Sequence, residues 1–299
     1  MERTLKSTHW EDPAVSTPAH EVESEDRFGF GKNWIRFLRV LNDERIKEAE
    51  QSLRGMLEVD NLVGKSFLDV GSGSGLFSLA ARRLGARVYS FDFDSHSVAC
   101  TAELRRRYFP DDPQWKVERG SALDSSYLKS LGRFDVVYAW GVLHHTGAMW
   151  QALANVEPAV ADGGRLFIAI YNDQLHWSGV WTAIKKLYVH LPLVLRVPYT
   201  AALIVFMQAK TAPGSLLTFQ PRRFIHSWTQ YARTSRGMSR WHDMIDWIGG
   251  YPFEVAKPEQ IFDFYRAKGF VLLKLKTCAG GKGCNEFVFQ RTGFAEKFS

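Results

Sequence analysis

The 299-residue sequence contains few cysteines and no long uninterrupted apolar run. Its three cysteines, Cys100, Cys278 and Cys284, are too few for a disulfide framework, and no pair has the two-residue spacing of redox and zinc motifs. A chain of this length can bury a full core without such crosslinks. We therefore expect reduced thiols and no bound metal, with a thiol pair across the turn between Cys278 and Cys284 as the lesser alternative.

The sequence also lacks a secretory signal, because its first thirty residues contain no apolar segment. Residues 1–27 instead carry seven acidic and three basic residues, a net charge of 3 − 7 = −4. The whole chain is +6, so the remainder is +10. We expect residues 1–27 to form a flexible acidic tail and the protein to be cytoplasmic.

No segment is long and apolar enough to span a membrane. Residues 187–209 come nearest, but Arg196 and two prolines interrupt them, and the longest uncharged stretch, Val197–Ala209, has 13 residues. A spanning helix needs about 20. Pro192 and Pro198 predict several short helices. These helices would form the core of a lid or a contact in a homodimer. Alternatively, they would lie on a membrane surface, and the protein would then be a peripheral membrane protein.

Most of the chain alternates between strand and helix patterns. Residues 28–62 predict two helices that join near Asn42, and a helix is expected at 258–268. The alternation predicts a doubly wound Rossmann-like α/β sheet of seven strands that ends in an antiparallel hairpin. The predicted strands are 66–70, 87–92, 115–119, 134–140, 165–171, 270–278 and 285–291, with helices at 76–84, 95–108 and 148–160.

A glycine-rich loop, LDVGSGSG at residues 68–75, follows the first predicted strand. Glycines at alternate positions let backbone N–H groups approach a ligand at the start of a helix. Leu76 stands where a dinucleotide fingerprint needs a small residue, which argues against nicotinamide and flavin cofactors. Asp69 precedes the loop and is placed to orient it or to bind a cationic ligand. Asp92, at the end of the second strand, is placed to bind a ribose diol.

Together with GSALD at 120–124 and FDVVYAWGVLHHT at 134–146, these motifs resemble the class I S-adenosylmethionine-dependent methyltransferases. The resemblance covers residues 65–171 and, more loosely, 258–291. It implies S-adenosylmethionine as the cofactor and residues 63–171 as the Rossmann-like core that binds it. Residues 251–299 would complete that core.

The resemblance implies roles for residues of the glycine loop and the second strand. Gly71 and Gly73 would let the backbone approach the methionine part of the cofactor, with Gly75 in the same loop. Asp69 would hold that end, and Asp92 would bind both ribose hydroxyls.

It also implies contacts further along the chain. Phe93 would lie against the adenine, and Trp140 would pass close to the sulfonium. Ser121 and Ala122 stand where the family often has an acidic residue, so backbone contacts to the adenine are expected there. Asp94 is expected to cap the following helix.

Methyl transfer from a sulfonium is an in-line displacement, so alignment and the exclusion of water do most of the work. A hydroxyl acceptor is helped by a general base, for which His144 and His145 are the first candidates and His242 is the next. A capping or packing role is the alternative for each histidine. An acceptor carboxylate needs no base.

Residues 172–250 interrupt the alternation and are expected to form a helical lid. Residues 171–250 contain nine Lys or Arg and three Asp, with many aromatic residues. The resemblance implies that an insertion here covers the active site and selects the acceptor. Arginines suit a carboxylate or phosphate, although a solvated surface explains them equally well. The candidate substrate contacts are Tyr171, Arg222, Arg223, Arg240 and Trp241.

These features predict methyl transfer to a small molecule, at the oxygen of an aromatic, quinone-like or carboxylate-bearing metabolite. A tRNA or nucleic-acid methyltransferase is an alternative, made less favourable because WGVLHH at 140–145 replaces the proline-containing motif of amino-methylating enzymes. A binding protein that retains the cofactor fold without catalysis is the other alternative.

Overall fold

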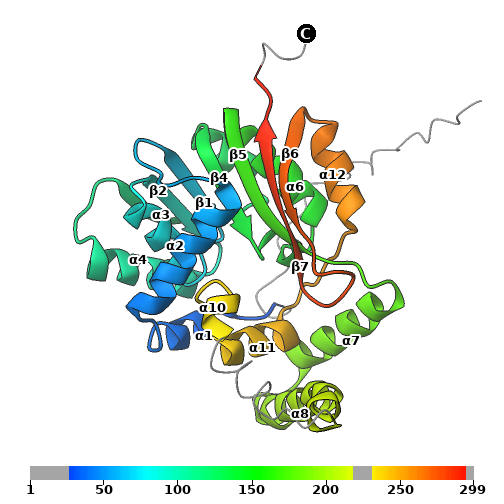
Figure 1. Cartoon of the computed structure of the whole chain (residues 1–299). Coiled ribbons are helices and arrows are strands. Elements are labelled where there is room, and N and C mark those ends of the chain that lie inside the picture. The colour runs from blue at the N-terminus through cyan, green and yellow to red at the C-terminus, as the bar shows by residue number, and fades with distance from the viewer. Residues whose placement is uncertain (1–26, 218–230, 294–299) are drawn as a thin grey trace, which may run out of the picture.

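The computed structural model describes residues 27–217 and 231–293, and predictions for residues 1–26, Arg222 and Arg223 lie outside this part of the chain. Its centre is a seven-stranded sheet of strand order β3-β2-β1-β4-β5-β7-β6 (Figure 1). Neighbouring strands from β3 to β5 are parallel, and β7 is antiparallel to both β5 and β6. This confirms the predicted fold class. The strands are β1 Ser66–Val70, β2 Arg87–Asp92, β3 Trp115–Arg119, β4 Phe134–Trp140, β5 Val160–Tyr171, β6 Phe270–Lys276 and β7 Cys284–Arg291.

Alternate side chains of the strands supply two separate hydrophobic cores. Phe67 and Val136 belong to one core and Leu68 and Val137 to the other, as the period of two in a strand requires. Four helices pack on the first core: α1 Phe30–Phe37, α2 Asp43–Leu57, α3 Leu76–Arg83 and α4 Ser95–Tyr108. Three more pack on the second: α5 Ser125–Ser130, α6 Met149–Val156 and α12 Pro258–Arg266.

The N-terminal segment forms the two predicted helices, α1 Phe30–Phe37 and α2, and the side chain of Asn42 caps α2 by accepting a hydrogen bond from Arg45 N. Asp94 caps α4 as predicted, since its carboxylate accepts from His96 N at 2.8 Å.

Two local predictions were wrong. The helix expected at 148–160 ends at Val156, and a short 3-10 turn over Glu157–Ala159 leads directly into β5. β5 begins at Val160 rather than Arg165, because the residues expected to form a turn are a bulge within the strand: Phe134 pairs with Val160 and Val136 with Arg165. The helix α5 was not predicted, since its six residues are too few for a clear periodicity.

The lid residues form helices at the carboxyl ends of the parallel strands (Figure 1). These are α7 His176–His190, α8 Leu193–Leu217, α10 Tyr231–Thr234 and α11 Arg240–Gly249. Pro192 separates α7 from α8, but Pro198 lies inside α8 and does not break it, contrary to the prediction. Pro198 is the sixth residue of α8, so its missing N–H removes one hydrogen bond, to the carbonyl four residues earlier, and the rest of the helix continues past it. None of the helices in the described ranges is sufficiently long and apolar to cross a membrane.

Gly75 offers a test of the packing between α3 and α4. It has φ +80°, and an added Cβ would lie 2.7 Å from the backbone Cα of Thr101. Gly132 has φ +81° with nothing within 4 Å of such a Cβ, so it isolates the cost of the left-handed backbone. Both Ala variants should lose about 1–2 kcal/mol for that backbone. Gly75→Ala should lose about 1–3 kcal/mol more because it overpacks the contact. Urea unfolding measures both, and equal losses would contradict the packing role.

Candidate active site

A cavity of about 720 Å³ opens at the carboxyl ends of β1, β2 and β4. Its walls come from the glycine loop, the ends of β2 and β4, the N-terminal segment, the lid and the turn before β7. The predicted residues that line it are Asp69, Gly71, Gly73, Asp92, Phe93, Trp140, His145 and Tyr171. In parallel α/β sheets, ligands bind outside this edge of the strands.

The glycine loop lies so close to its neighbours that side chains would not fit. A Cβ on Gly71, which has φ +72°, would come within 2.4 Å of Val142, and one on Gly73, which has φ +55°, within 3.0 Å of the Trp34 indole nitrogen. The Gly73 N–H donates to Asp92 Oδ2 at 2.9 Å. Gly75 caps α3 and does not line the cavity. The loop therefore presents bare backbone to the cavity.

Two buried carboxyl groups face this loop. Asp92 accepts hydrogen bonds from the N–H groups of Gly73 and Asp94, both at 2.9 Å, and burial raises its pKa to about 6. Asp69 accepts a 2.5 Å hydrogen bond from Ser78 Oγ, and burial raises its pKa to about 7. Each carboxylate oxygen has two lone pairs, so Asp92 keeps acceptor capacity for a ligand.

The ring of Phe93 lies near two guanidinium groups, those of Arg27 at 5.1 Å and Arg119 at 5.3 Å from its centroid. The structure places Ser121 and Ala122 outside the cavity wall. Ala122 is part of the second hydrophobic core, and Ser121 Oγ accepts from Leu123 N at 3.0 Å. The backbone around these two residues therefore continues into the helix α5.

The three candidate histidines lie in different surroundings. His145 lines the cavity, and its Nδ1 is 2.6 Å from the carbonyl oxygen of Pro252. His144 is completely buried, with its ring 4.0 Å from that of Tyr171, and does not line the cavity. His242 lies outside the cavity wall, and its Nδ1 is 2.9 Å from Ser239 Oγ.

The tautomer of His145 follows from its partner. A carbonyl oxygen only accepts, so Nδ1 carries the proton and Nε2 keeps its lone pair. Burial, followed by the nearby charge of Lys185, lowers the pKa of His145 to about 3. The imidazole is therefore neutral at pH 7 and is held in one tautomer.

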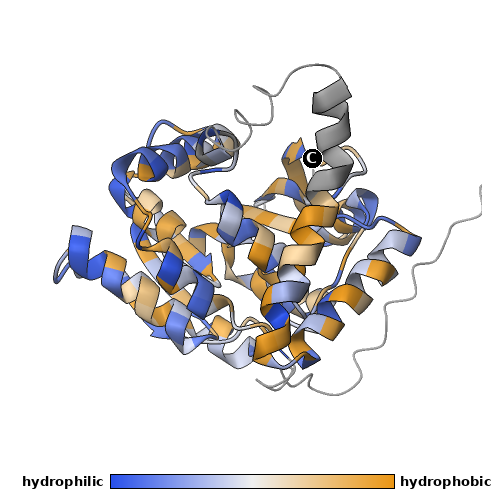
Figure 2. Ribbon diagram, turned by 90° about the horizontal axis from the view of Figure 1, so that it is seen from below, coloured by the Kyte–Doolittle hydropathy of each residue, from blue (hydrophilic) through white to orange (hydrophobic). Residues whose placement is uncertain are grey.

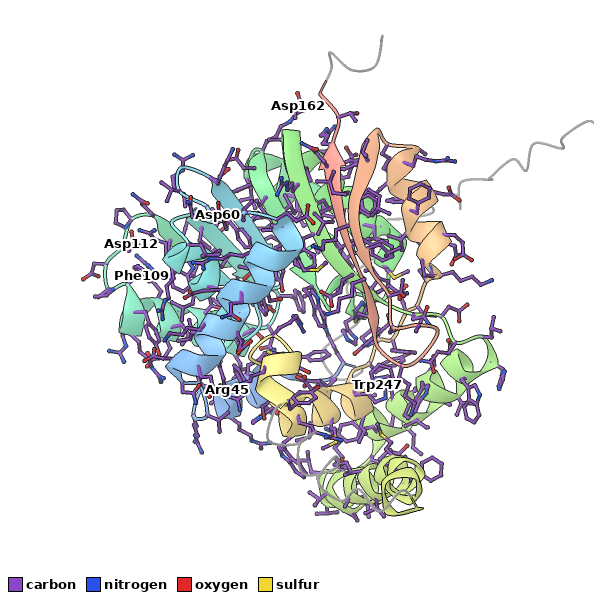
Figure 3. All side chains as sticks on the ribbon, viewed as in Figure 1. Arg45, Asp60, Phe109, Asp112, Asp162 and Trp247 are labelled. Carbon is purple, nitrogen blue, oxygen red and sulfur yellow. The ribbon has the colours of Figure 1, made fainter. Side chains whose placement is uncertain are left out.

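The lid contributes to the cavity one of its basic residues, Arg236, which is not among the five candidate substrate contacts predicted from the sequence. The Arg236 guanidinium carbon lies 3.1 Å from the ring centroid of Trp140. Arg45 of α2 holds the following turn by donating to the carbonyl oxygens of Gly237, at 2.9 Å, and Met238, at 2.6 Å (Figure 3 labels Arg45). Gly237, next to Arg236, indicates a turn in the sequence, but only the fold brings Arg236 to Trp140.

The other lid candidates point elsewhere. The Arg240 guanidinium lies 5.9 Å from the Tyr231 ring, and Trp241 is half exposed. Neither lines the cavity.

Two partly buried lid acids also reach the cavity. Asp243 accepts from the Tyr231 hydroxyl at 2.8 Å, and burial raises its pKa to about 6. Asp246 accepts from the Asn33 amide at 2.8 Å, and burial followed by the charge of Asp243 raises its pKa well above the usual range. Neither acid stood out in the sequence, because their spacing matches any polar helix face.

A fully buried lysine lies behind this wall. Lys185 of α7 donates to the backbone carbonyl of Trp247, which Figure 3 labels on α11. Its ammonium is 4.7 Å from the rings of both Trp247 and Phe253 and 5.6 Å from that of Tyr171. Burial lowers its pKa to about 7. Lys185 thus joins α7 to α11 and to the end of β5.

The N-terminal segment closes the side of the cavity. The Phe28 N–H donates to the Tyr251 carbonyl at 2.9 Å, and the Gly31 N–H donates to Asp94 Oδ2 at 2.9 Å. The Phe30 ring lies 4.8 Å from that of His145. In the described part of the chain, no group of three or more His, Cys, Asp or Glu is arranged to hold a metal ion.

Comparison with known sequences agrees with this geometry. Residues 68–166 match a family described as a methyltransferase domain. A ribosomal protein L11 methyltransferase from Streptococcus uberis is 31% identical over 33% of this chain and 41% of its own length. A ubiquinone biosynthesis O-methyltransferase from Coxiella burnetii is 28% identical over 45% of this chain and 53% of its own length. The chain spans about half or less of these relatives.

A solved structure resembles the chain over most of its length. The magnesium protoporphyrin IX methyltransferase from Synechocystis PCC 6803, crystallised with S-adenosylhomocysteine, has a TM-score of 0.50 and 14% identity. The match covers 87% of this chain and 95% of that one, and at this identity it shows the fold alone. Residues 68–166 therefore form a methyltransferase domain, and the strand order and fold of the chain are those of the class I S-adenosylmethionine-dependent methyltransferases.

Proposed function

We propose that this protein transfers a methyl group from S-adenosylmethionine to a small-molecule acceptor, at an oxygen of an aromatic, quinone-like or carboxylate-bearing metabolite. One observation carries the proposal: a single cavity extends from the glycine loop and Asp92 to the aromatic wall around His145. Cofactor and acceptor would therefore meet without crossing solvent. In this proposal residues 63–171 form the cofactor-binding core and residues 172–250 the lid.

The residues at the first end of the cavity fit the cofactor. The bare backbone of Gly71 and Gly73 leaves room for the methionine part, and Asp69 would hold it. Asp92 would accept hydrogen bonds from both ribose hydroxyls. Phe93 would lie against the adenine, with Ser121 and Ala122 nearby only through the backbone. Bound S-adenosylmethionine supplies a methyl group already activated on a sulfonium.

The other end fits an aromatic acceptor with an anionic group. Trp140, Tyr171 and Trp247 provide ring surfaces, and Arg236 provides a cation beside Trp140. Arg236 therefore takes the role first expected of Arg240, while Arg222 and Arg223 stay candidates on the sequence alone.

His145 is the base we propose for a hydroxyl acceptor. A pKa of about 3 makes this imidazole a weak base, so its Nε2 would take the acceptor proton late, as the oxygen bonds the methyl group and becomes strongly acidic, while Pro252 holds Nδ1. His144 is sealed from the cavity and would act only by supporting Tyr171.

Two other functions are tested together with this one. The basic lid would also suit a tRNA or other nucleic acid, and a protein without an acceptor would only bind the cofactor. Incubation with methyl-labelled S-adenosylmethionine and separate aqueous, lipid and RNA fractions of an extract distinguishes the three. We expect label in a small molecule; label in RNA, or in no fraction, would contradict the proposal.

Residues 187–209 would contact a further partner, either a membrane surface or a second copy of the chain. The notable feature is α8, whose outer face exposes apolar side chains such as Val194 and Val205.

The ribose assignment predicts the effect of Asp92→Ala. The variant leaves two ribose hydroxyls without their charged acceptor, which should cost about 2–3 kcal/mol of S-adenosylhomocysteine affinity. Isothermal calorimetry measures it. Asp124→Ala is the control, because Asp124 caps α5 outside the cavity and should affect only stability. An unchanged affinity in Asp92→Ala would refute the assignment.

The raised pKa values predict a pH dependence of cofactor binding. The charged carboxylate binds hydroxyls better, and Asp92 has a pKa of about 6. The contribution of Asp92 should thus be complete above about pH 7 and fall as the pH drops below 6, by up to about tenfold per pH unit. Asp92→Asn should flatten this fall, leaving what Asp69 contributes with its pKa of about 7. A wild-type affinity that stays constant between pH 5 and 8 would show that the charge is not used.

The general-base role predicts that His145→Gln lowers turnover by about 10²-fold or more, with cofactor affinity intact. His242→Gln is the matched control, because His242 lies outside the cavity wall. Single-turnover rates with the identified acceptor measure both. Full activity in His145→Gln would leave alignment alone as the source of catalysis.

A further inference from the structure

We propose that the outer face of α8, with the adjoining end of α7, docks on the surface of an anionic phospholipid bilayer. This docking goes beyond the proposed function and does not require it. It adds to that function a route by which an apolar acceptor reaches the cavity, and only this addition rests on the proposed function.

From Leu193 to Phe206, the outer face of α8 is apolar and exposed. Pro192, Pro198, Ala201 and Ala202 are exposed on it. Its larger side chains are Leu193, Val194, Val197, Val205 and Phe206, with exposed fractions of 76%, 79%, 74%, 67% and 54%. Contiguous apolar surface of this kind marks an interaction site.

The single charged residue between 192 and 207 is turned away from this face. The Arg196 guanidinium donates to the backbone carbonyls of Leu191, at 2.9 Å, and Val189, at 2.7 Å. It therefore caps the end of α7 and leaves no charge on the outer face of α8 between Leu193 and Phe206.

Folding of the lid does not need the outer face. Tyr199, Leu203, Ile204 and Met207 follow the helical repeat on the opposite side of α8, where they pack on a core of Tyr188, Val189 and Ile248. The apolar residues on the outer face are thus in excess of what holds α8 in place, as is typical of a helix that lies in a membrane interface.

The charge of the lid suits anionic lipid headgroups. Residues 174–242 contain nine Lys or Arg and neither Asp nor Glu. Within the described helices, Lys186 is exposed beside Leu187, which is itself half exposed, at the end of α7 that adjoins α8. A basic, apolar surface without acidic residues is attracted to anionic membranes. Lys185, the neighbour of Lys186, is buried instead and does not belong to this surface.

The position of α8 also favours a flat partner. It lies at the end of the molecule beyond the carboxyl edge of the sheet (Figure 1). Viewed from that end, helices of this region carry orange, hydrophobic residues at the surface (Figure 2). Met207 of the same helix lines the cavity, so docking would bring the acceptor end of the cavity next to the lipid.

The test is co-sedimentation of the whole chain with phosphatidylcholine–phosphatidylglycerol vesicles, at about 0.05 M and 0.5 M salt. We expect wild type to bind, with weaker binding at high salt. The vesicle affinity of Val194→Glu/Val197→Glu should be at least about tenfold lower than that of wild type, since two carboxylates would enter the interface. Val63→Glu/Val271→Glu makes the same charge change at exposed positions away from the lid and should bind like wild type.

Three results would overturn the proposal. Wild type could stay in the supernatant at low salt, or both double variants could bind vesicles equally well. The third is that wild type forms a dimer in the absence of vesicles and that Val194→Glu/Val197→Glu dissociates this dimer. The last would make a second copy the partner. Calorimetry with S-adenosylhomocysteine on every variant keeps this test separate from the proposed function. Intact cofactor binding without vesicle binding refutes only the docking, and the reverse refutes only the cofactor assignment.

Discussion

The carboxylates of Asp92 and Asp94, at the end of β2 and just after it, connect the chain segments that surround the cavity. Asp92 accepts from the backbone of the glycine loop, and Asp94 accepts from the start of α4 and from Gly31 in the N-terminal segment. A buried carboxylate needs such donors, because an unpaired charge away from water is costly. The same hydrogen bonds therefore satisfy the acids and fix three chain segments around one space. The loop conformation, the capping of α4 and the closure of the cavity side all depend on them.

The sheet and its order of elements could be predicted because each strand carries its own signal. Residues 66–70, 87–92, 115–119 and 134–140 were predicted to the residue, since apolar runs ending at glycine or aspartate are local features. The bulge in β5 was missed because Asp162-Gly163-Gly164 is also a typical turn sequence, and only pairing with β4 decides between the two.

The cavity could be predicted only in part. Residues on the strand ends, such as Asp69 and Asp92, follow from the motif. Residues brought there by long-range packing do not: Arg236 reaches Trp140 because Arg45, far away in the sequence, holds the turn after it. His144 and His145 could not be separated by sequence either, since what distinguishes them is the carbonyl of Pro252, more than a hundred residues later.

The lid combines two demands that compete for the same residues. Its inner side must enclose an apolar space and yet hold the buried ammonium of Lys185 and the partly buried carboxyl groups of Asp243 and Asp246. Lys185 resolves part of this conflict, because its ammonium donates to a backbone carbonyl among three aromatic rings and lies near enough to Asp246 to interact with it. Burial and, after it, the charge of Lys185 lower the pKa of His145, so the group that joins the lid helices helps to keep the neighbouring imidazole neutral. The packing of the lid and the protonation state of the cavity wall are therefore linked through one side chain, and a change in one alters the other.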